Sequence, residues 1–135
     1  MNRKKQTNEL RSYNITVWGR YPSLNEYIKA LKNSKHVGDA MKSRSQENII
    51  ADIYEQKGRL RIDNPIVIHY TFIEPNKKRD MDNISGYFHK VFQDALVQAG
   101  VIVNDGWSYI RGYSDDFDVD SNNPRIEIVL EEVER

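Results

Sequence analysis

The sequence contains no cysteine. This excludes disulfides, thiolate zinc sites and a catalytic cysteine, and it fits a reducing compartment. The three histidines are far apart in the chain, so we do not expect a histidine-rich zinc site. No apolar run approaches the roughly 20 residues of a membrane helix, and no apolar segment follows the basic N-terminus as in a signal peptide. We therefore expect a cytoplasmic protein with no membrane partner.

The formal net charge is zero, but the charges are unevenly distributed along the chain. Residues 1–61 hold 13 Lys and Arg against 6 Asp and Glu, whereas residues 62–135 hold 7 against 14. A basic half favours a polyanionic partner such as a nucleic acid. An acidic half would repel that partner, unless some of its carboxylates bind metal ions. Two mixed, solvated surfaces are the simpler interpretation, and composition alone favours it.

A chain of 135 residues is expected to form one domain. We predict a flexible basic arm at residues 1–12 and a single domain at residues 13–135. Alternation and β-branched residues predict strands, helical periodicity predicts helices, and an acidic stretch predicts a loop. The strands are expected at 13–18, 65–73, 101–103, 107–110 and from 126; the helices after a capping box of Ser23 and Glu26, at about 40–56, and from Asp82 or Asn83 to about 99; the loop at 115–124. The order β-α-α-β-α-β-β-β indicates an α+β fold, a small mixed sheet with helices packed on it.

The run KKRDMDN places two aspartates directly after three basic residues. In extended backbone the side chains of Asp80 and Asp82 point the same way, so they could share a hard cation. Lys77, Lys78 and Arg79 would then bind phosphates nearby. The alternative is a charged turn followed by an aspartate helix cap, which is the better interpretation of this run taken alone.

Asp105 adds a third carboxylate, just after an apolar segment and before Gly106. An Asp-Gly pair is by itself a strong signal for a hairpin turn. As a third metal ligand, Asp105 would complete a site suited to phosphodiester hydrolysis with Mg²⁺. Lys90 lies on the same predicted helix as Asp82, about 12 Å along its axis.

Four segments in this order resemble the RusA-type Holliday junction resolvases, which are often encoded by phages. They are YPSLNEY, RDMDN, DALVQAGVIVND and PRIEI, and the resemblance extends over about residues 15–131. It implies a homodimeric, Mg²⁺-dependent endonuclease that cuts four-way DNA junctions by paired nicks, with Mn²⁺ as an alternative metal. The family's three essential aspartates match Asp80, Asp82 and Asp105.

The resemblance also assigns two further residues. Asn25 matches the asparagine of the family's Pro-Ser-x-Asn segment, near the DNA site. The position of the family's helix lysine is occupied by Gly86, and Lys90, about one helical turn later, is the next candidate. Two other functions stay open. One is a non-catalytic DNA-binding protein of the same fold; the other is a small Ca²⁺-binding module built on Asp116, Asp118 and Asp120.

Overall fold

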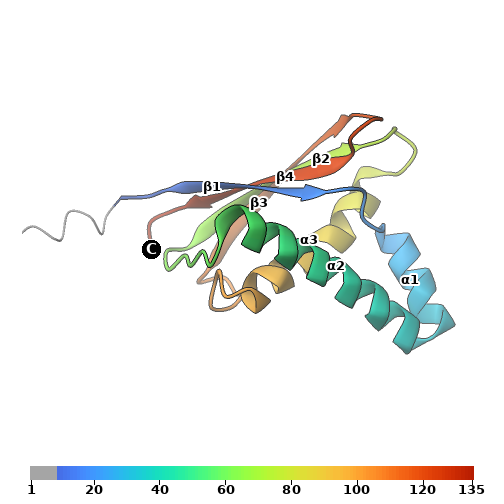
Figure 1. The fold of residues 1–135 in the computed structure, drawn as a ribbon, viewed down its shortest axis with the longest axis horizontal. Helices are drawn as coiled ribbons and strands as arrows, with labels where there is room; N and C mark the ends of the chain where they lie inside the picture. The colour runs from blue at the N-terminus through green and yellow to red at the C-terminus, as the bar shows by residue number, and fades with distance from the viewer. Residues whose placement is uncertain (1–8) are drawn as a thin grey trace, which may run out of the picture.

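The computed structural model describes residues 9–135. Seven elements follow one another along the chain, as Figure 1 shows: β1 (Ser12–Trp18), α1 (Leu24–Asn33), α2 (Lys35–Lys57), β2 (Ile66–Glu74), α3 (Met81–Gln98), β3 (Ile110–Val119) and β4 (Arg125–Glu132). Most of the predicted arm, residues 1–8, lies outside the described residues. Glu9, Leu10 and Arg11 are exposed and lead directly into β1.

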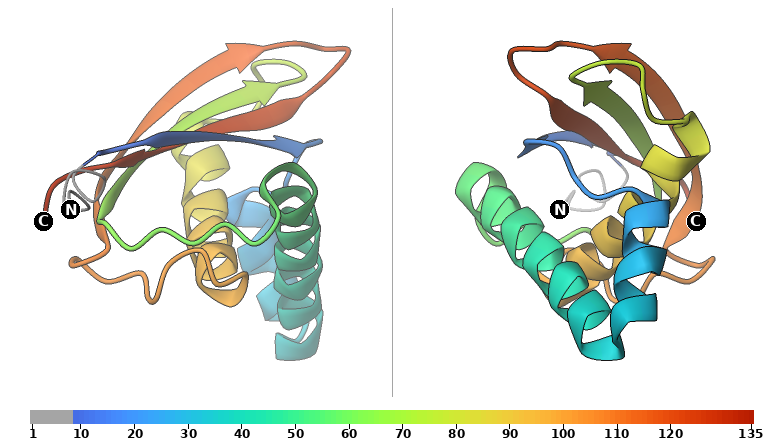
Figure 2. Two further views of the ribbon diagram at one scale, coloured as in Figure 1. Left: turned by 60° about the vertical axis from the view of Figure 1, so that its left-hand side comes forward. Right: turned by 90° about the vertical axis from the view of Figure 1, so that its right-hand side faces the viewer.

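The four strands form one mixed sheet in the order β1-β4-β2-β3. β4 lies antiparallel between β1 and β2, and β3 pairs with β2 in parallel at the edge. Parallel strands need a long connection, which is α3 together with the segment that follows it. The helices lie on one face of the sheet, and the other face is open in both views of Figure 2.

The core lies between this face of the sheet and the helices. Alternate residues of the strands point inward, and they meet the apolar side of α3. Tyr70 and Phe72 of β2 contact Phe88 edge-to-face, with ring centroids 6.0 and 5.8 Å apart. This aromatic packing fixes the direction of α3 across the sheet.

The α+β class and the small mixed sheet are confirmed. The structure differs from the prediction after α3, where two strands follow rather than three. Residues 101–103 do not form a strand. Val101 and Ile102 are both buried, and the backbone at this point closes the C-terminal end of α3. The N–H of Val101 donates to the carbonyl of Leu96, and Gly100 has a φ of 78°. This arrangement is typical of a helix end with a left-handed glycine.

The predicted acidic loop at 115–124 is largely a strand. β3 extends to Val119, and its edge position explains its acidic composition. Phe117 stacks on Phe72 on the helix side, while Asp116 and Asp118 are exposed. Charged side chains are common on edge strands, because they oppose pairing with other sheets. Asp120 follows in a turn, where its carboxylate accepts a hydrogen bond from Arg125.

None of the helices within residues 9–135 is both long and apolar enough to span a bilayer.

Candidate functional site at the two ends of helix α3

Asp80 is the N-cap of α3, whereas the predicted cap was Asp82 or Asn83, two or three residues later. Its carboxylate makes no hydrogen bond to the helix backbone, although aspartate at this position commonly does. Asp82 lies in the first turn, and both side chains are exposed. A helix N-terminus interacts favourably with negative charge. Both carboxylates are therefore solvated at the start of α3, and that of Asp80 is free of a capping role. Asp82 lies within the helix, so the extended backbone that was expected to point both side chains the same way is not present.

An open hollow of about 390 Å³ lies beside Asp80, between the loop after β2 and the end of β3. Lys77 and Asn76 line it from the loop, and Asp118 lines it from β3. Asp118 is a carboxylate that the sequence interpretation assigned only to the Ca²⁺ alternative. The pairing of β3 with β2 brings it here, because Asp118 lies opposite Ile73 at the end of the ladder.

Arg79 has a different position from the one expected of a phosphate-binding residue. Its guanidinium donates to both carboxylate oxygens of Glu74, at 3.0 and 2.8 Å, and to the carbonyl of Tyr21 at 2.8 Å. The side chains of Arg79 and Glu74 are only 12% and 10% exposed. Arg79 thus joins the loop to β2 and to the segment before α1, and it is not available to DNA. Lys77 and Lys78 remain exposed.

The start of α1 lies against the start of α3. The backbone N–H of Asn25 donates to Asn83 Oδ1 at 2.8 Å. The predicted capping box is confirmed: Ser23 accepts from the N–H of Glu26, and Glu26 accepts from the N–H of Ser23. The hydrogen bond that the Glu26 carboxylate accepts from the backbone N–H of Ser23 is the main cause that holds the pKa of Glu26 below its ordinary value. Asn25 is therefore held near Asp80 and Asp82, with its side chain exposed.

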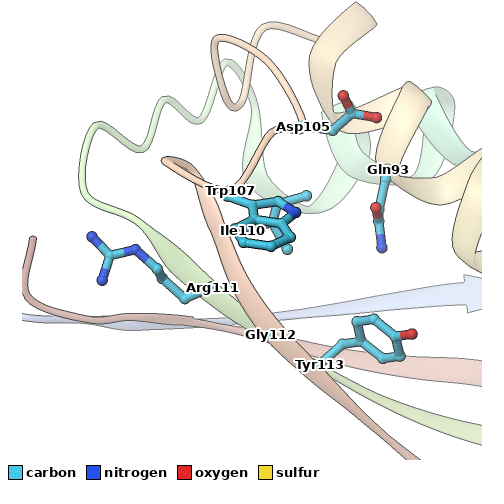
Figure 3. A pocket seen from close by; sticks show the side chains of 7 residues that line it. All are labelled: Gln93, Asp105, Trp107, Ile110, Arg111, Gly112 and Tyr113. Carbon is cyan, nitrogen blue, oxygen red and sulfur yellow. The ribbon is translucent and has the colours of Figure 1, made fainter.

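Asp105 lies at the opposite end of α3. It lines a second open hollow, of about 430 Å³, with Gln93 of α3 and with Trp107 and Tyr113, as Figure 3 shows. Gln93 lies thirteen residues after Asp80, which corresponds to about 20 Å along a helix. The predicted hairpin turn is a local turn instead, closed by the hydrogen bond from the N–H of Gly106 to Asn104 Oδ1. One chain does not bring Asp105 to Asp80 and Asp82.

Within its described part, a single chain also does not assemble a metal site from three side chains. Among residues 9–135, no three His, Cys, Asp or Glu side chains are close enough together to hold a metal ion. A pair of carboxylates with substrate phosphates is nevertheless a common way to bind Mg²⁺. The carboxylates at the start of α3 have the chemistry that such a cation prefers, and residues 9–135 of one chain bring no third ligand to them.

Lys90 also lies away from the first pair. Its ammonium is 3.7 Å from Asp94 Oδ1, and Lys42 of α2 contacts the other oxygen of the same carboxylate at 3.3 Å. Lys90 and Asp94 therefore lie on the side of α3 that faces α2. Lys77, which shares the hollow with Asp80, is the better-placed cation.

Trp107 is a residue that the sequence interpretation did not single out. Its side chain is 93% exposed, although the turn that carries it is held by hydrogen bonds from Tyr109 and Ile110 to the carbonyl of Gly106. Tryptophan is rarely this exposed on a fixed backbone without a partner. A tryptophan next to an Asn-Asp-Gly turn is the signal that could have drawn attention to this position.

No family model matches the chain, and no curated protein matches it.

Proposed function

We propose that the protein is a Mg²⁺-dependent endonuclease of the RusA type, which cuts four-way DNA junctions in the cytoplasm. The observation that carries the proposal is the free carboxylate of Asp80, next to Asp82 and beside Lys77. An N-cap aspartate that makes no cap bond is available to a ligand. The order of the four sequence segments supports the same activity.

Asp80 and Asp82 would hold Mg²⁺, and Mn²⁺ could replace it. When bound, the metal activates water for attack on phosphorus and stabilises the charge that develops on the leaving oxygen. The chain itself contributes the carboxylates, and Lys77 and Lys78 on the adjacent loop bind the phosphates on either side of the cleaved bond. Asn25, held at the start of α1, is placed to contact DNA near this point.

Asp105 enters the proposal through a homodimer. Each chain offers an incomplete site at each end of α3, and a two-fold axis brings residue i of one copy to residue j of the other, and j to i. We propose that Asp105 of one copy completes the pair of Asp80 and Asp82 in the other. Such a dimer has two equivalent sites, which fits paired nicks in a symmetric junction.

A cleavage assay tests the activity. The wild type is incubated with a synthetic four-way junction, with and without Mg²⁺, and linear duplex serves as the substrate control. We expect paired nicks in the junction with Mg²⁺, none in EDTA, and little cleavage of the duplex. A wild type that never nicks the junction with Mg²⁺ or Mn²⁺ contradicts the proposal.

A second candidate is a non-catalytic DNA-binding protein of the same fold. It is favoured by one observation, that residues 9–135 of a single chain contain no group of three metal-binding side chains. The same assay separates the two, because this candidate binds the junction in EDTA and leaves it uncut when Mg²⁺ is added.

A further inference from the structure

A third hollow lies on the other side of the segment that joins β1 to α1. It has a volume of about 530 Å³ and lies between Trp18–Pro22 and the N-terminal half of α2. Arg20, His36 and Arg44 line it, together with Asn48 and the half-exposed Trp18. Among the described residues, 9–135, no carboxylate lines it. In a chain with a net charge of zero, this hollow is a local concentration of positive charge.

The two arginines of this basic groove are not neutralised by ion pairs. Within residues 9–135 neither Arg20 nor Arg44 forms a salt bridge, whereas Arg79 and Arg125 each bind two carboxylates. Both groove arginines are exposed. Their guanidinium groups are therefore available to an anion from solution.

Two carboxylates near the segment that joins β1 to α1 are already bound to other groups. Asp52 accepts the backbone N–H of Trp18 at 3.2 Å. Glu26 accepts the N–H of Ser23 and lies 3.4 Å from Arg79, and Arg20 is a weaker influence on it. The groove therefore keeps its positive potential, although acidic residues flank it.

The groove and the loop with Lys77 and Lys78 lie on opposite sides of one short piece of backbone. Tyr21 lines the groove, and its carbonyl accepts a hydrogen bond from Arg79 of the loop. In Figure 2 (right), this connecting segment runs from β1 to α1, with α2 on one side and the start of α3 on the other. A polyanion that leaves the carboxylate pair can continue past this segment into the groove.

We propose that the basic groove binds the phosphate backbone of a DNA duplex arm, through Arg20 and Arg44, and so directs that arm away from the carboxylates. This rests on the proposed function, since it takes DNA as the substrate. Guanidinium groups suit phosphate because they present several donors in a planar fork. Contacts to phosphates carry no sequence information, so the groove adds affinity for any duplex arm and fixes its direction.

The test is the salt dependence of DNA binding in EDTA, where no cleavage occurs. The anisotropy of a labelled four-way junction and of a labelled duplex is measured over a range of KCl concentrations. The logarithm of the binding constant falls with the logarithm of salt by about 0.9 for each phosphate that the protein neutralises. Replacing both arginines, Arg20→Ala with Arg44→Ala, should therefore reduce this slope by about 2 for both DNAs.

Two matched variants control the experiment. Lys57→Ala with Arg59→Ala removes the same charge at the far end of α2, about 20 Å along the helix from Arg44, and should leave the slope nearly unchanged. Arg20→Lys with Arg44→Lys keeps the charge and should keep the slope. The midpoint of thermal unfolding is measured for each variant, so that only folded proteins are compared.

An unchanged slope in the alanine pair of the groove overturns the inference, and so does an equal reduction in both alanine pairs, which reflects total charge alone. The failure of the proposed function looks different. If the variants change the salt slope as expected but the wild type does not nick the junction, the inference about the groove stands and the proposed nuclease activity is wrong. If the wild type nicks the junction but the alanine pair of the groove leaves the salt slope unchanged, only the inference about the groove is wrong.

Discussion

The two ends of helix α3 carry different sets of polar side chains. The N-terminal end has two exposed carboxylates and two exposed lysines, and the loop before it is held by the buried pair of Arg79 and Glu74. The C-terminal end has a single carboxylate, Asp105, beside exposed aromatic rings. Under the proposed function, the first end would bind the metal and phosphates, and the second end would complete the site of another copy.

The largest expected effect is on cleavage. Asp82→Asn and Asp105→Asn should each lower Mg²⁺-dependent junction cleavage by about 100-fold or more, since each removes a carboxylate that would hold the metal, and the metal's charge stabilises the transition state. Binding of the junction in EDTA should be retained. Quantitative gel assays of nicking measure both variants against wild type.

Asp118→Asn is the matched control, because Asp118 shares the hollow with Asp80 inside one chain. We expect its cleavage rate to stay within a few-fold of wild type. If Asp118→Asn abolishes cleavage while Asp105→Asn does not, the site is completed within one chain and the comparison between the two ends fails.

The second prediction concerns stability at the N-terminal end. Arg79→Met leaves the carboxylate of Glu74 buried without its partner, which should lower the free energy of unfolding by about 3–5 kcal/mol. Urea denaturation followed by circular dichroism measures this loss. Converting both residues, Glu74→Met with Arg79→Met, should recover much of it.

Arg111→Met provides the comparison at the other end. Its guanidinium is exposed and makes one long contact, 3.4 Å, with the carbonyl of Glu134. We expect a change below about 0.5 kcal/mol. Equal losses for Arg79→Met and Arg111→Met would show that the buried pair does not hold the loop.

The third prediction separates the two candidate lysines. Lys77→Ala should weaken junction binding in EDTA several-fold and lower the salt slope by about 1, because one phosphate contact is lost. Lys90→Ala should change neither, since Lys90 lies beside Asp94 on the side facing α2. The reverse result would restore Lys90 as the cation of the site.

The fourth prediction uses Trp107 as a reporter of the C-terminal end. In the Trp18→Phe variant, Trp107 is the single tryptophan, and its emission should shift to shorter wavelength as dimers form, because its indole leaves water. A dilution series without DNA, matched to sedimentation data, measures the shift. Dimers in which Trp107 stays fully solvated would mean that this end does not face the second copy.

Much of the local structure could be predicted from local signals. The capping box of Ser23 and Glu26, the strand β2 and the apolar stripe of α3 depend on neighbours within a few residues, and all three are confirmed. Burial of β2 on both faces was wrong, because the helices cover only one face of the sheet and burial alternates along the strand. β3 could not be predicted in this way. Its parallel pairing with β2 joins residues about 45 positions apart, and an acidic edge strand resembles a loop in sequence.

The candidate site shows the same division. The sequence placed Asp80 and Asp82 together at the start of a helix, which is a local property. The position of Asp105 depends on the length of α3 against the short return that follows it, and the irregular backbone there, closed by Gly100, does not lead back to Asp80. The ion pair of Arg79 likewise depends on a carbonyl of Tyr21, which is remote in sequence.

The most direct test of the central claim mixes two inactive variants. One carries Asp80→Asn with Asp82→Asn, the other carries Asp105→Asn, and mixed dimers are isolated through two different affinity tags. If the two ends of α3 meet across a dimer, each mixed dimer has one intact site, so it should nick a four-way junction once, at about half the wild-type rate per dimer. If the mixed dimers are as inactive as either variant alone, each site is built within one chain and the account is contradicted.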